Sequence, residues 1–216
     1  MHTNDSAALT DSDLDELGSM GGAFGIGELS KAKEDWVLAT TARIDGKLHG
    51  FMFSTLERIG GTPCVLIGLA TVKRTGKRTE VLKALMADQY RRAVLAFPDE
   101  DVLIGTRFVD PSGFEAFALS RVLQDVVPRP GHKATGEERA WGRRLAKRFG
   151  VDADYDDRAF LAKGDGAVPC VLDHESLKPG VVSDEVRALF DAVDTSRGDS
   201  LIAFGWAMAE DLASLA

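Results

Sequence analysis

Three stretches rich in apolar and β-branched residues follow one another closely, at residues 36–44, 48–59 and 64–72. Asp45-Gly46 lies between the first two stretches, and Gly60-Gly61 lies between the second and the third. Dipeptides of this kind between strands favour two-residue hairpin turns. The pattern therefore predicts a three-stranded antiparallel meander.

A helical pattern follows the meander. Apolar residues recur at spacings of three and four over residues 81–97, and Thr79 is the predicted N-cap. Residues 102–108 form a fourth apolar run, which a helical crossover would return parallel to the third strand. Asp110-Pro111 ends this run, and a second helix is predicted from residue 112 to about residue 126.

The rest of the chain is predicted to be mostly helical. Thr135 and Glu138 have the spacing of a capping box, and Ser183 is the predicted cap of another helix. A short strand is expected at residues 168–172 and a buried strand at residues 200–208. Near the N-terminus, a short helix at residues 13–20 precedes a glycine cluster that we interpret as a flexible connection.

These elements define an α+β fold, with a central, mostly antiparallel sheet, one parallel β-α-β crossover and flanking helices. We expect an N-terminal helical or flexible segment at residues 1–35, a core at 36–126 and a helical extension at 127–216 with a final strand. A chain of 216 residues with 44% hydrophobic composition can bury such a core without disulfides.

The net charge and the composition exclude some classes of binding partner. The net charge of −8 argues against nucleic-acid binding, which needs a broad basic face. The first residues lack a secretory leader pattern, and no apolar run is long enough to cross a bilayer, so we expect no membrane partner and a cytoplasmic protein.

Cysteines and histidines give no sign of a metal site. We interpret Cys64 and Cys170 as reduced packing residues, because their spacing fits neither a disulfide framework nor a zinc site. The four histidines are scattered, and no metal is expected. They are His2, His49, His132 and His174.

Basic side chains concentrate where the meander gives way to the helix. Lys73-Arg74-Thr75-Gly76-Lys77-Arg78 carries four cationic side chains and one glycine at a predicted helix start. Exposed backbone N–H groups and the positive end of the helix dipole can hold a polyphosphate there. The alternative is a solvated basic turn without a ligand.

Three segments between residues 36 and 120 resemble the GCN5-related N-acetyltransferase (GNAT) superfamily. Residues 37–51, with Asp45-Gly46-Lys47 and Gly50-Phe51, resemble the family's second and third strands. Residues 64–78 resemble the fourth strand and the pyrophosphate loop, and Asp110-Pro111 with the following helix resembles the segment after the fifth strand.

The resemblance implies that acetyl-CoA or another acyl-CoA lies between the strands at 64–72 and 102–108, with its pyrophosphate on backbone N–H groups of the basic turn. Lys73, Gly76 and Arg78 fall on the three positions of the loop pattern Arg/Gln-x-x-Gly-x-Gly/Ala. The expected acyl-CoA contacts are Leu69, Ala70, Thr71, Val72, Arg74, Thr75, Gly76, Lys77, Arg78, Thr79 and Asp110.

Two residues depart from the family pattern. Arg78 stands where glycine or alanine belongs, and its side chain either contacts phosphate or crowds the backbone approach. Phe117 stands where the family often has a tyrosine that protonates the departing thiolate, and phenylalanine has no proton to give. Glu57 and His49 are the candidate catalytic bases.

Three functions are consistent with these features. The first is an acyltransferase that moves an acetyl or other acyl group from acyl-CoA to a small-molecule or protein amine acceptor by direct attack. The second is a non-catalytic CoA-binding or protein-interaction module, and the third is a long-chain or carrier-protein-dependent N-acyltransferase. Basic residues at 139–148 form a solvated face or contact an acidic carrier protein or the CoA 3′-phosphate, and the final apolar strand is available to pair in a homodimer.

Overall fold

The structure is a computed structural model that describes every residue except 21–23, 119, 165, 167–181 and 215–216. The strand predicted at residues 168–172, Cys170 and His174 lie outside the described residues.

The predicted meander is confirmed and extended by one strand. β1 (His2–Asp5), β2 (Leu38–Ile44), β3 (Lys47–Ile59) and β4 (Thr62–Val72) pair antiparallel in that order. Both glycine-containing turns have the positive φ angles of type I′ hairpins, with values of 50° and 77° in the first and 61° and 91° in the second.

The parallel crossover is also confirmed. α3 (Arg78–Ala96) leads to β5 (Val102–Phe108), which pairs parallel to β4. Among the described residues nine strands form one sheet, in the order β1-β2-β3-β4-β5-β9-β8-β7, with β6 also paired to β9. The later strands are β6 (Leu123–Val127), β7 (Tyr155–Asp156), β8 (Leu161–Ala162) and β9 (Ser200–Ala207).

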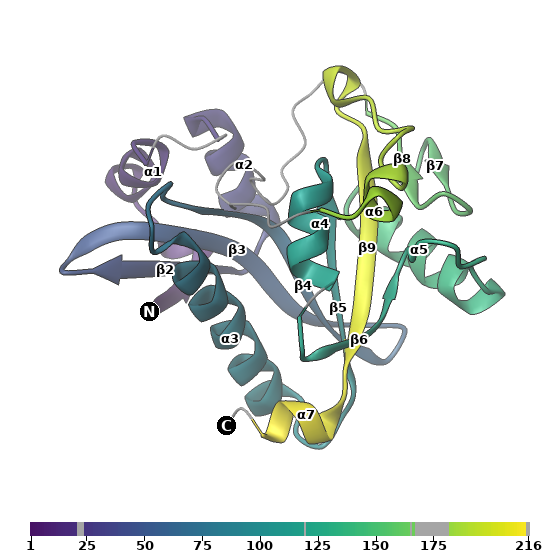
Figure 1. Ribbon diagram of the computed structural model, residues 1–216. Helices are drawn as coiled ribbons and strands as arrows, with labels where there is room; N and C mark the ends of the chain where they lie inside the picture. The colour runs from purple at the N-terminus through teal and green to yellow at the C-terminus, as the bar shows by residue number, and fades with distance from the viewer. Residues whose placement is uncertain (21–23, 119, 165, 167–181, 215–216) are drawn as a thin grey trace.

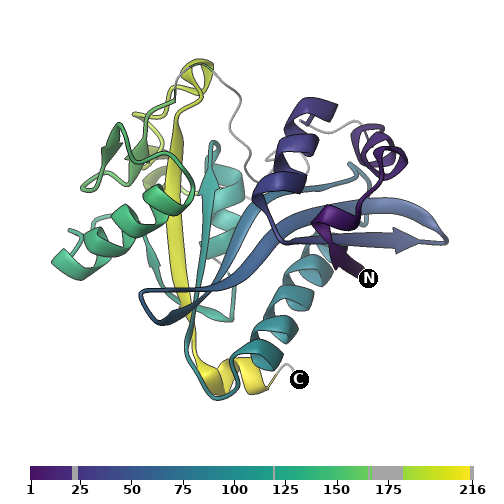
Figure 2. The same cartoon turned by 180° about the vertical axis from the view of Figure 1, so that it is seen from behind.

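Helices cover both faces of this sheet. α3, α4 and α6 lie on the face toward the viewer in Figure 1, whereas α1, α2 and α5 lie on the opposite face, which Figure 2 shows. All three segments predicted from the sequence contribute strands to the one sheet. The remaining helices are η1 (Ser6–Ala8), α1 (Asp11–Gly18), α2 (Ile26–Asp35), α4 (Pro111–Ala118), α5 (Gly136–Arg148), α6 (Asp184–Ala188), η3 (Thr195–Arg197) and α7 (Ala209–Ala213).

Small and polar residues fix α3 on the sheet. An added Cβ on Gly50 would come within 2.7 Å of Val81 Cγ1, so glycine lets the first turn of α3 approach β3 closely. Farther along the helix, Ser54 donates a 2.8 Å hydrogen bond to the Gln89 side chain, which in turn donates one of 3.2 Å to Thr40. These buried bonds tie α3 to β2 and β3, and so set the position of its N-terminus.

Two predictions about helix boundaries are wrong. The helix expected to reach residue 126 ends at Ala118, because residues 123–127 pair with β9 as β6, and this sheet pairing outweighs local helix propensity. The N-cap of α3 is Lys77 rather than Thr79, and it makes no side-chain cap bond.

Two further expectations also need correction. Part of the expected flexible N-terminal connection is α2, where Gly25 is the N-cap and its N–H donates to Glu28 at 2.7 Å. The final strand, β9, lies inside the sheet with β5 on one edge and β6 and β8 on the other. It therefore has no long free edge for pairing in a homodimer; a homodimer formed in another way stays a prediction.

Candidate functional site

The pairing between β4 and β5 ends midway along β4, and the two strands diverge from there. Their parallel register runs from Cys64–Leu103 to Leu66–Gly105 and ends there, whereas β4 continues to Val72. At the point of separation the buried Thr106 hydroxyl donates a 3.0 Å hydrogen bond to the carbonyl oxygen of Ile67. A side chain thus replaces the next ladder bond, and the two strands diverge beyond it.

Gly68 marks the start of the divergent part of β4. The β3–β4 register passes from Ser54–Ile67 to Phe53–Leu69, so Gly68 is the extra residue of a β-bulge. An added Cβ there would lie 1.9 Å from Cε2 of Trp36, whose ring therefore rests on the Gly68 backbone. A lone glycine in an apolar strand is the sequence signal for such a close approach, and it was not used in the prediction.

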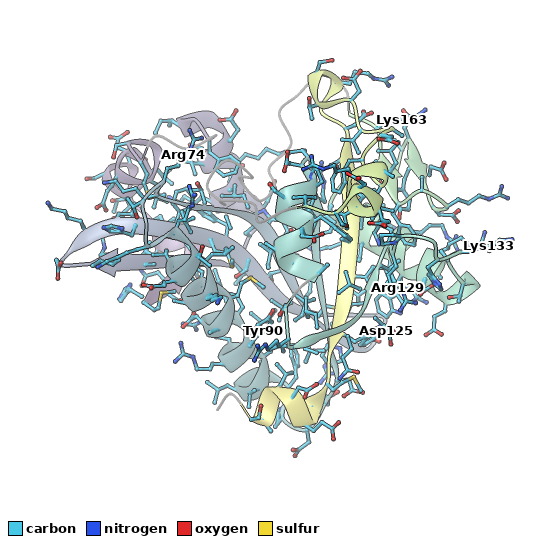
Figure 3. All side chains as sticks on the ribbon, in the orientation of Figure 1. Arg74, Tyr90, Asp125, Arg129, Lys133 and Lys163 are labelled. Atoms are coloured by element: carbon cyan, nitrogen blue, oxygen red, sulfur yellow. The ribbon has the colours of Figure 1, made fainter. Side chains whose placement is uncertain are left out.

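The helices that follow β4 and β5 also diverge. α3 and α4 lie on the same face of the sheet and come together toward the C-terminal half of α3, where the Tyr90 hydroxyl lies 3.3 Å from Ser120 Oγ (Figures 1 and 3). Burial raises the pKa of the Tyr90 phenol, and this hydrogen bond offsets part of the rise. The N-termini of both helices lie at the other, open end, beside the C-terminal ends of β4 and β5.

The basic turn lies at this open end, and its own hydrogen bonds define its shape. The Arg78 N–H donates to the Thr75 carbonyl at 3.2 Å, and the Lys77 N–H donates to Thr75 Oγ1 at 3.3 Å. Within the described part of the chain, three neighbouring backbone N–H groups have no hydrogen-bond partner. They belong to Gly76, Thr79 and Glu80.

These three N–H groups lie at the first turn of a 19-residue helix. The side chains of Lys73 and Lys77 are exposed beside them, and that of Arg78 is partly exposed. An added Cβ on Gly76 would meet no atom within 4 Å, so the space over this residue is open. The turn therefore combines backbone donors, positive charge and room for an anion.

The predicted contacts at the end of β4 line its divergent part. The four residues are buried, and each pairs with β3 on one side, while β5 no longer pairs with them on the other. They are Leu69, Ala70, Thr71 and Val72.

Asp110 lies at the start of α4, across the open end from the basic turn. Its carboxylate accepts hydrogen bonds from the Ser112 N–H, at 2.7 Å, and from the Ser112 hydroxyl. This carboxylate neutralises the positive end of α4. An anionic ligand is therefore favoured at α3 rather than at α4. Phe117 is buried in α4, with its ring 5.4 Å from that of Phe108.

The predicted bases lie away from Gly68 along the sheet. Glu57 is opposite Cys64, which is about 13 Å along β4 from Gly68 at the usual strand rise. The His49 carbonyl accepts the Lys73 N–H, about 16 Å beyond Gly68 in the other direction. His49 Nδ1 is buried and has no hydrogen-bond partner among the residues that the structure describes. The catalytic roles of both residues stay predictions.

Glu57 is joined to Arg148, the last residue of the basic run at 139–148, although nothing in the sequence indicates that these two residues meet. Arg148 Nε, at the end of α5, donates a 2.6 Å hydrogen bond to Glu57 Oε1. The Arg148 guanidinium also lies 5.2 Å from the centre of the Trp36 ring. Residues 36, 57 and 148 are far apart in the sequence, and only the folded chain brings them together. Arg148 ends α5 and Trp36 caps α2, and Figure 2 shows these two helices on the same face of the sheet.

Two other basic residues of α5 have local partners. Arg143 pairs with Asp157, and the Arg144 guanidinium lies 4.6 Å from the centre of the Trp141 ring. Within the described residues, no group of three or more His, Cys, Asp or Glu side chains is arranged to hold a metal ion. No helix in the described part of the chain has both the length and the apolar character needed to cross a bilayer.

Comparison with known proteins finds similarity to solved structures alone. No protein-family model and no curated protein matches the chain. The ribosomal-protein-S18-alanine N-acetyltransferase from Escherichia coli is 9% identical, with 96% of this chain and 94% of that chain covered and a TM-score of 0.47. Naa20 from Chaetomium thermophilum, solved with a bisubstrate analogue, is 12% identical, with coverages of 99% and 90% and a TM-score of 0.46.

A third similar structure is the aminoglycoside 6′-N-acetyltransferase from Enterococcus faecium. It is 14% identical, with a TM-score of 0.39, and the match covers 52% of this chain and 64%, less than two thirds, of that enzyme. The α+β fold predicted from the sequence, a mostly antiparallel sheet with one parallel β-α-β crossover, is confirmed by the order and direction of the strands, with β4 and β5 parallel and joined through α3.

Proposed function

We propose that this protein transfers an acyl group from an acyl-CoA to a primary amine. The observation that carries the proposal is the separation of β4 from β5 at Gly68, on a strand that leads directly into the basic turn. A long, thin ligand with an anionic middle fits this arrangement. CoA has that form, with a pantetheine arm joined to a pyrophosphate.

In the proposed complex, the pantetheine arm lies along residues 69–72 of β4, in the place where β5 no longer pairs. The pyrophosphate accepts hydrogen bonds from the N–H groups of Gly76, Thr79 and Glu80, and the cationic side chains of the turn add charge-assisted contacts. The Arg78 side chain lies at the helix start, where it supplies charge. The thioester then lies near Gly68.

The reaction is a direct attack on that thioester. The neutral amine nitrogen bonds to the carbonyl carbon, the carbon–sulfur bond breaks, and CoA leaves as a thiolate while the amine loses a proton. A thiol pKa of about 8.5 makes the thiolate an acceptable leaving group, so Phe117 does not prevent the reaction. Positioning of the two reactants and a backbone N–H directed at the carbonyl oxygen supply the rate enhancement.

A non-catalytic CoA-binding module is the second candidate. The Trp36 ring covers one side of Gly68, and Phe117 has no proton to donate. Both features favour a protein that holds acyl-CoA and does not transfer its acyl group. The third candidate, a long-chain or carrier-protein-dependent enzyme, differs only in the acyl donor.

The test is release of CoA thiol from acetyl-CoA and palmitoyl-CoA in the presence of spermidine, kanamycin, a lysine-containing peptide and the common amino acids. Amine-dependent release supports the acyltransferase. A rise in the unfolding midpoint with CoA but no release with any pair supports the binding module, and release only from palmitoyl-CoA supports the long-chain enzyme. No midpoint rise and no release would refute all three.

A further inference from the structure

Arg148 is held on two sides, by Glu57 and by the Trp36 ring that rests on Gly68. Its Nε donates to Glu57 at 2.6 Å, and its guanidinium carbon lies over the Trp36 ring, 5.2 Å from the ring centre. The Arg148 and Glu57 side chains are 30% and 28% exposed, so both are anchored yet open to solvent. An arginine fixed in this way has lost most of its side-chain freedom before any ligand arrives.

The geometry of this pair differs from that of two other arginine–glutamate pairs in the chain. Arg43 binds Glu16 through both Nη1 and Nη2, and Arg58 binds Glu100 through both as well. Arg148 binds Glu57 through Nε alone, and no other hydrogen bond of its guanidinium occurs within the described residues. Its two terminal amino groups therefore remain available to an external acceptor.

The position of Arg148 links it to the second substrate. α3, α4 and the basic turn lie on one face of the sheet, and the proposed acyl-CoA approaches Gly68 along that face. On the other face the Trp36 ring covers Gly68, so the amine has to reach the thioester past the edge of this ring, and the Arg148 guanidinium lies over the same ring. The terminal amino groups of Arg148, which lies over the Trp36 ring, can then bind an acceptor that approaches along this ring.

We propose that Arg148 binds a carboxylate of the acceptor, so that the preferred substrate is a small amine that also carries a carboxylate, such as an amino acid. This inference rests on the proposed acyl transfer. The planar guanidinium forms two parallel hydrogen bonds with a carboxylate, a geometry that lysine cannot reproduce. Glu57 is a positioning residue, because it orients the guanidinium and does not touch the acceptor.

The expected preference for an acceptor with a carboxylate follows from the strength of its hydrogen bonds to the guanidinium. Hydrogen bonds to charged groups contribute about 1.5–3 kcal/mol, which corresponds to roughly a 10- to 100-fold preference. An amino acid and its carboxamide differ only in this group, and they therefore form a matched pair of acceptors.

The experiment measures kcat/KM for CoA release from acetyl-CoA with the common amino acids and with their carboxamides. It compares the wild-type protein with Arg148→Met, Arg148→Lys and Arg58→Met. Arg58 is the matched control, because it also pairs with a glutamate and lies 5.1 Å from the centre of an aromatic ring, that of Phe97. The unfolding midpoint of each CoA-bound protein, with and without amino acid, gives a readout that does not depend on turnover.

We expect at least one amino acid to exceed its carboxamide by ~10-fold or more in the wild-type protein and in Arg58→Met. The ratio should approach one in Arg148→Met and should not recover in Arg148→Lys. A ratio near one in the wild-type protein, or an unchanged ratio in Arg148→Met, would overturn the inference. So would a protein that CoA stabilises but that no amino acid stabilises further or serves as acceptor. Absence of any CoA effect would instead refute the proposed function on which the inference rests.

Discussion

The ring of Trp36 lies on the backbone of Gly68, at the residue where β4 bulges and leaves β5. No side chain fits between them, since a Cβ on Gly68 would come within 1.9–2.4 Å of three indole atoms. The contact holds the end of α2 against the centre of the sheet and brings Trp36 within reach of Arg148.

Gly68→Ala should therefore displace Trp36 and destabilise the fold. Overpacking of a filled site costs about 1–3 kcal/mol, so the free energy of unfolding in urea should fall by about that amount. Gly76→Ala is the control, because its added Cβ meets no atom within 4 Å and its effect should stay within about 0.5 kcal/mol. Equal stability of Gly68→Ala and the wild-type protein would show that the ring does not rest there.

The chain has two tyrosines, and the titration of both should lower the stability of the folded state at alkaline pH. Burial raises the pKa of both phenols, and nearby Asp157 and Asp156 raise that of Tyr155 further. The folded state thus holds these protons more tightly than the unfolded state, whose tyrosines titrate near pH 10. Their stabilising contribution is complete below about pH 10 and is lost as the pH rises through the folded-state pKa values.

Urea unfolding of the wild-type protein and of Tyr90→Phe, compared at neutral pH and above pH 10, tests the predicted alkaline loss of stability. Each affected phenol contributes a decline of up to about 1.4 kcal/mol per pH unit, so Tyr90→Phe should lose stability less steeply than the wild-type protein. At neutral pH the substitution should cost about 0.5–1.5 kcal/mol for the lost bond to Ser120. Parallel alkaline slopes would contradict the raised pKa of Tyr90.

Cys64 should be inert in the folded protein. Burial raises the pKa of its thiol to about 12, and the side chain is fully buried, so the reactive thiolate is scarce and inaccessible. Iodoacetamide at mildly alkaline pH should leave Cys64 unmodified in the native protein and should alkylate it in urea, as peptide mapping by mass spectrometry would show. Rapid native alkylation would mean that β4 opens more readily than the structure indicates.

Local signals predicted much of this fold. The two type I′ turns, the capping box at Thr135 and the crossover between β4 and β5 all follow from residues close together in the sequence. β6 could not be predicted from its local sequence, because its strand conformation depends on pairing with β9 some 80 residues away. Propensity within the segment carries no information about that partner.

The candidate site shows the same division. The basic turn was recognised because its charges, glycine and helix start are contiguous in the sequence. Trp36, Gly68 and Arg148 were missed as a group, since their proximity arises from packing between α2, β4 and α5. Thr106 was missed for a similar reason, because its hydrogen bond to Ile67 replaces a ladder bond that no sequence pattern records.

The proposed function and the role proposed for Arg148 both depend on CoA binding at the basic turn, which a thermal titration of the wild-type protein with CoA measures. The charge-reversed variant is Lys73→Glu with Lys77→Glu, which reverses two exposed charges beside the free N–H groups at the start of α3. The control is Lys133→Glu with Lys163→Glu, which makes the same change in net charge at exposed positions away from the turn; Figure 3 labels both lysines on the opposite side of the molecule from Arg74.

We expect CoA to raise the unfolding midpoint of the wild-type protein and of the control in a concentration-dependent manner. In Lys73→Glu with Lys77→Glu the CoA concentration needed for the same shift should rise by at least ~10-fold, because each lost charge-assisted contact contributes about 1.5–3 kcal/mol. If saturating CoA does not shift the unfolding midpoint of the wild-type protein, or shifts that of the charge-reversed variant equally, CoA does not bind at the basic turn.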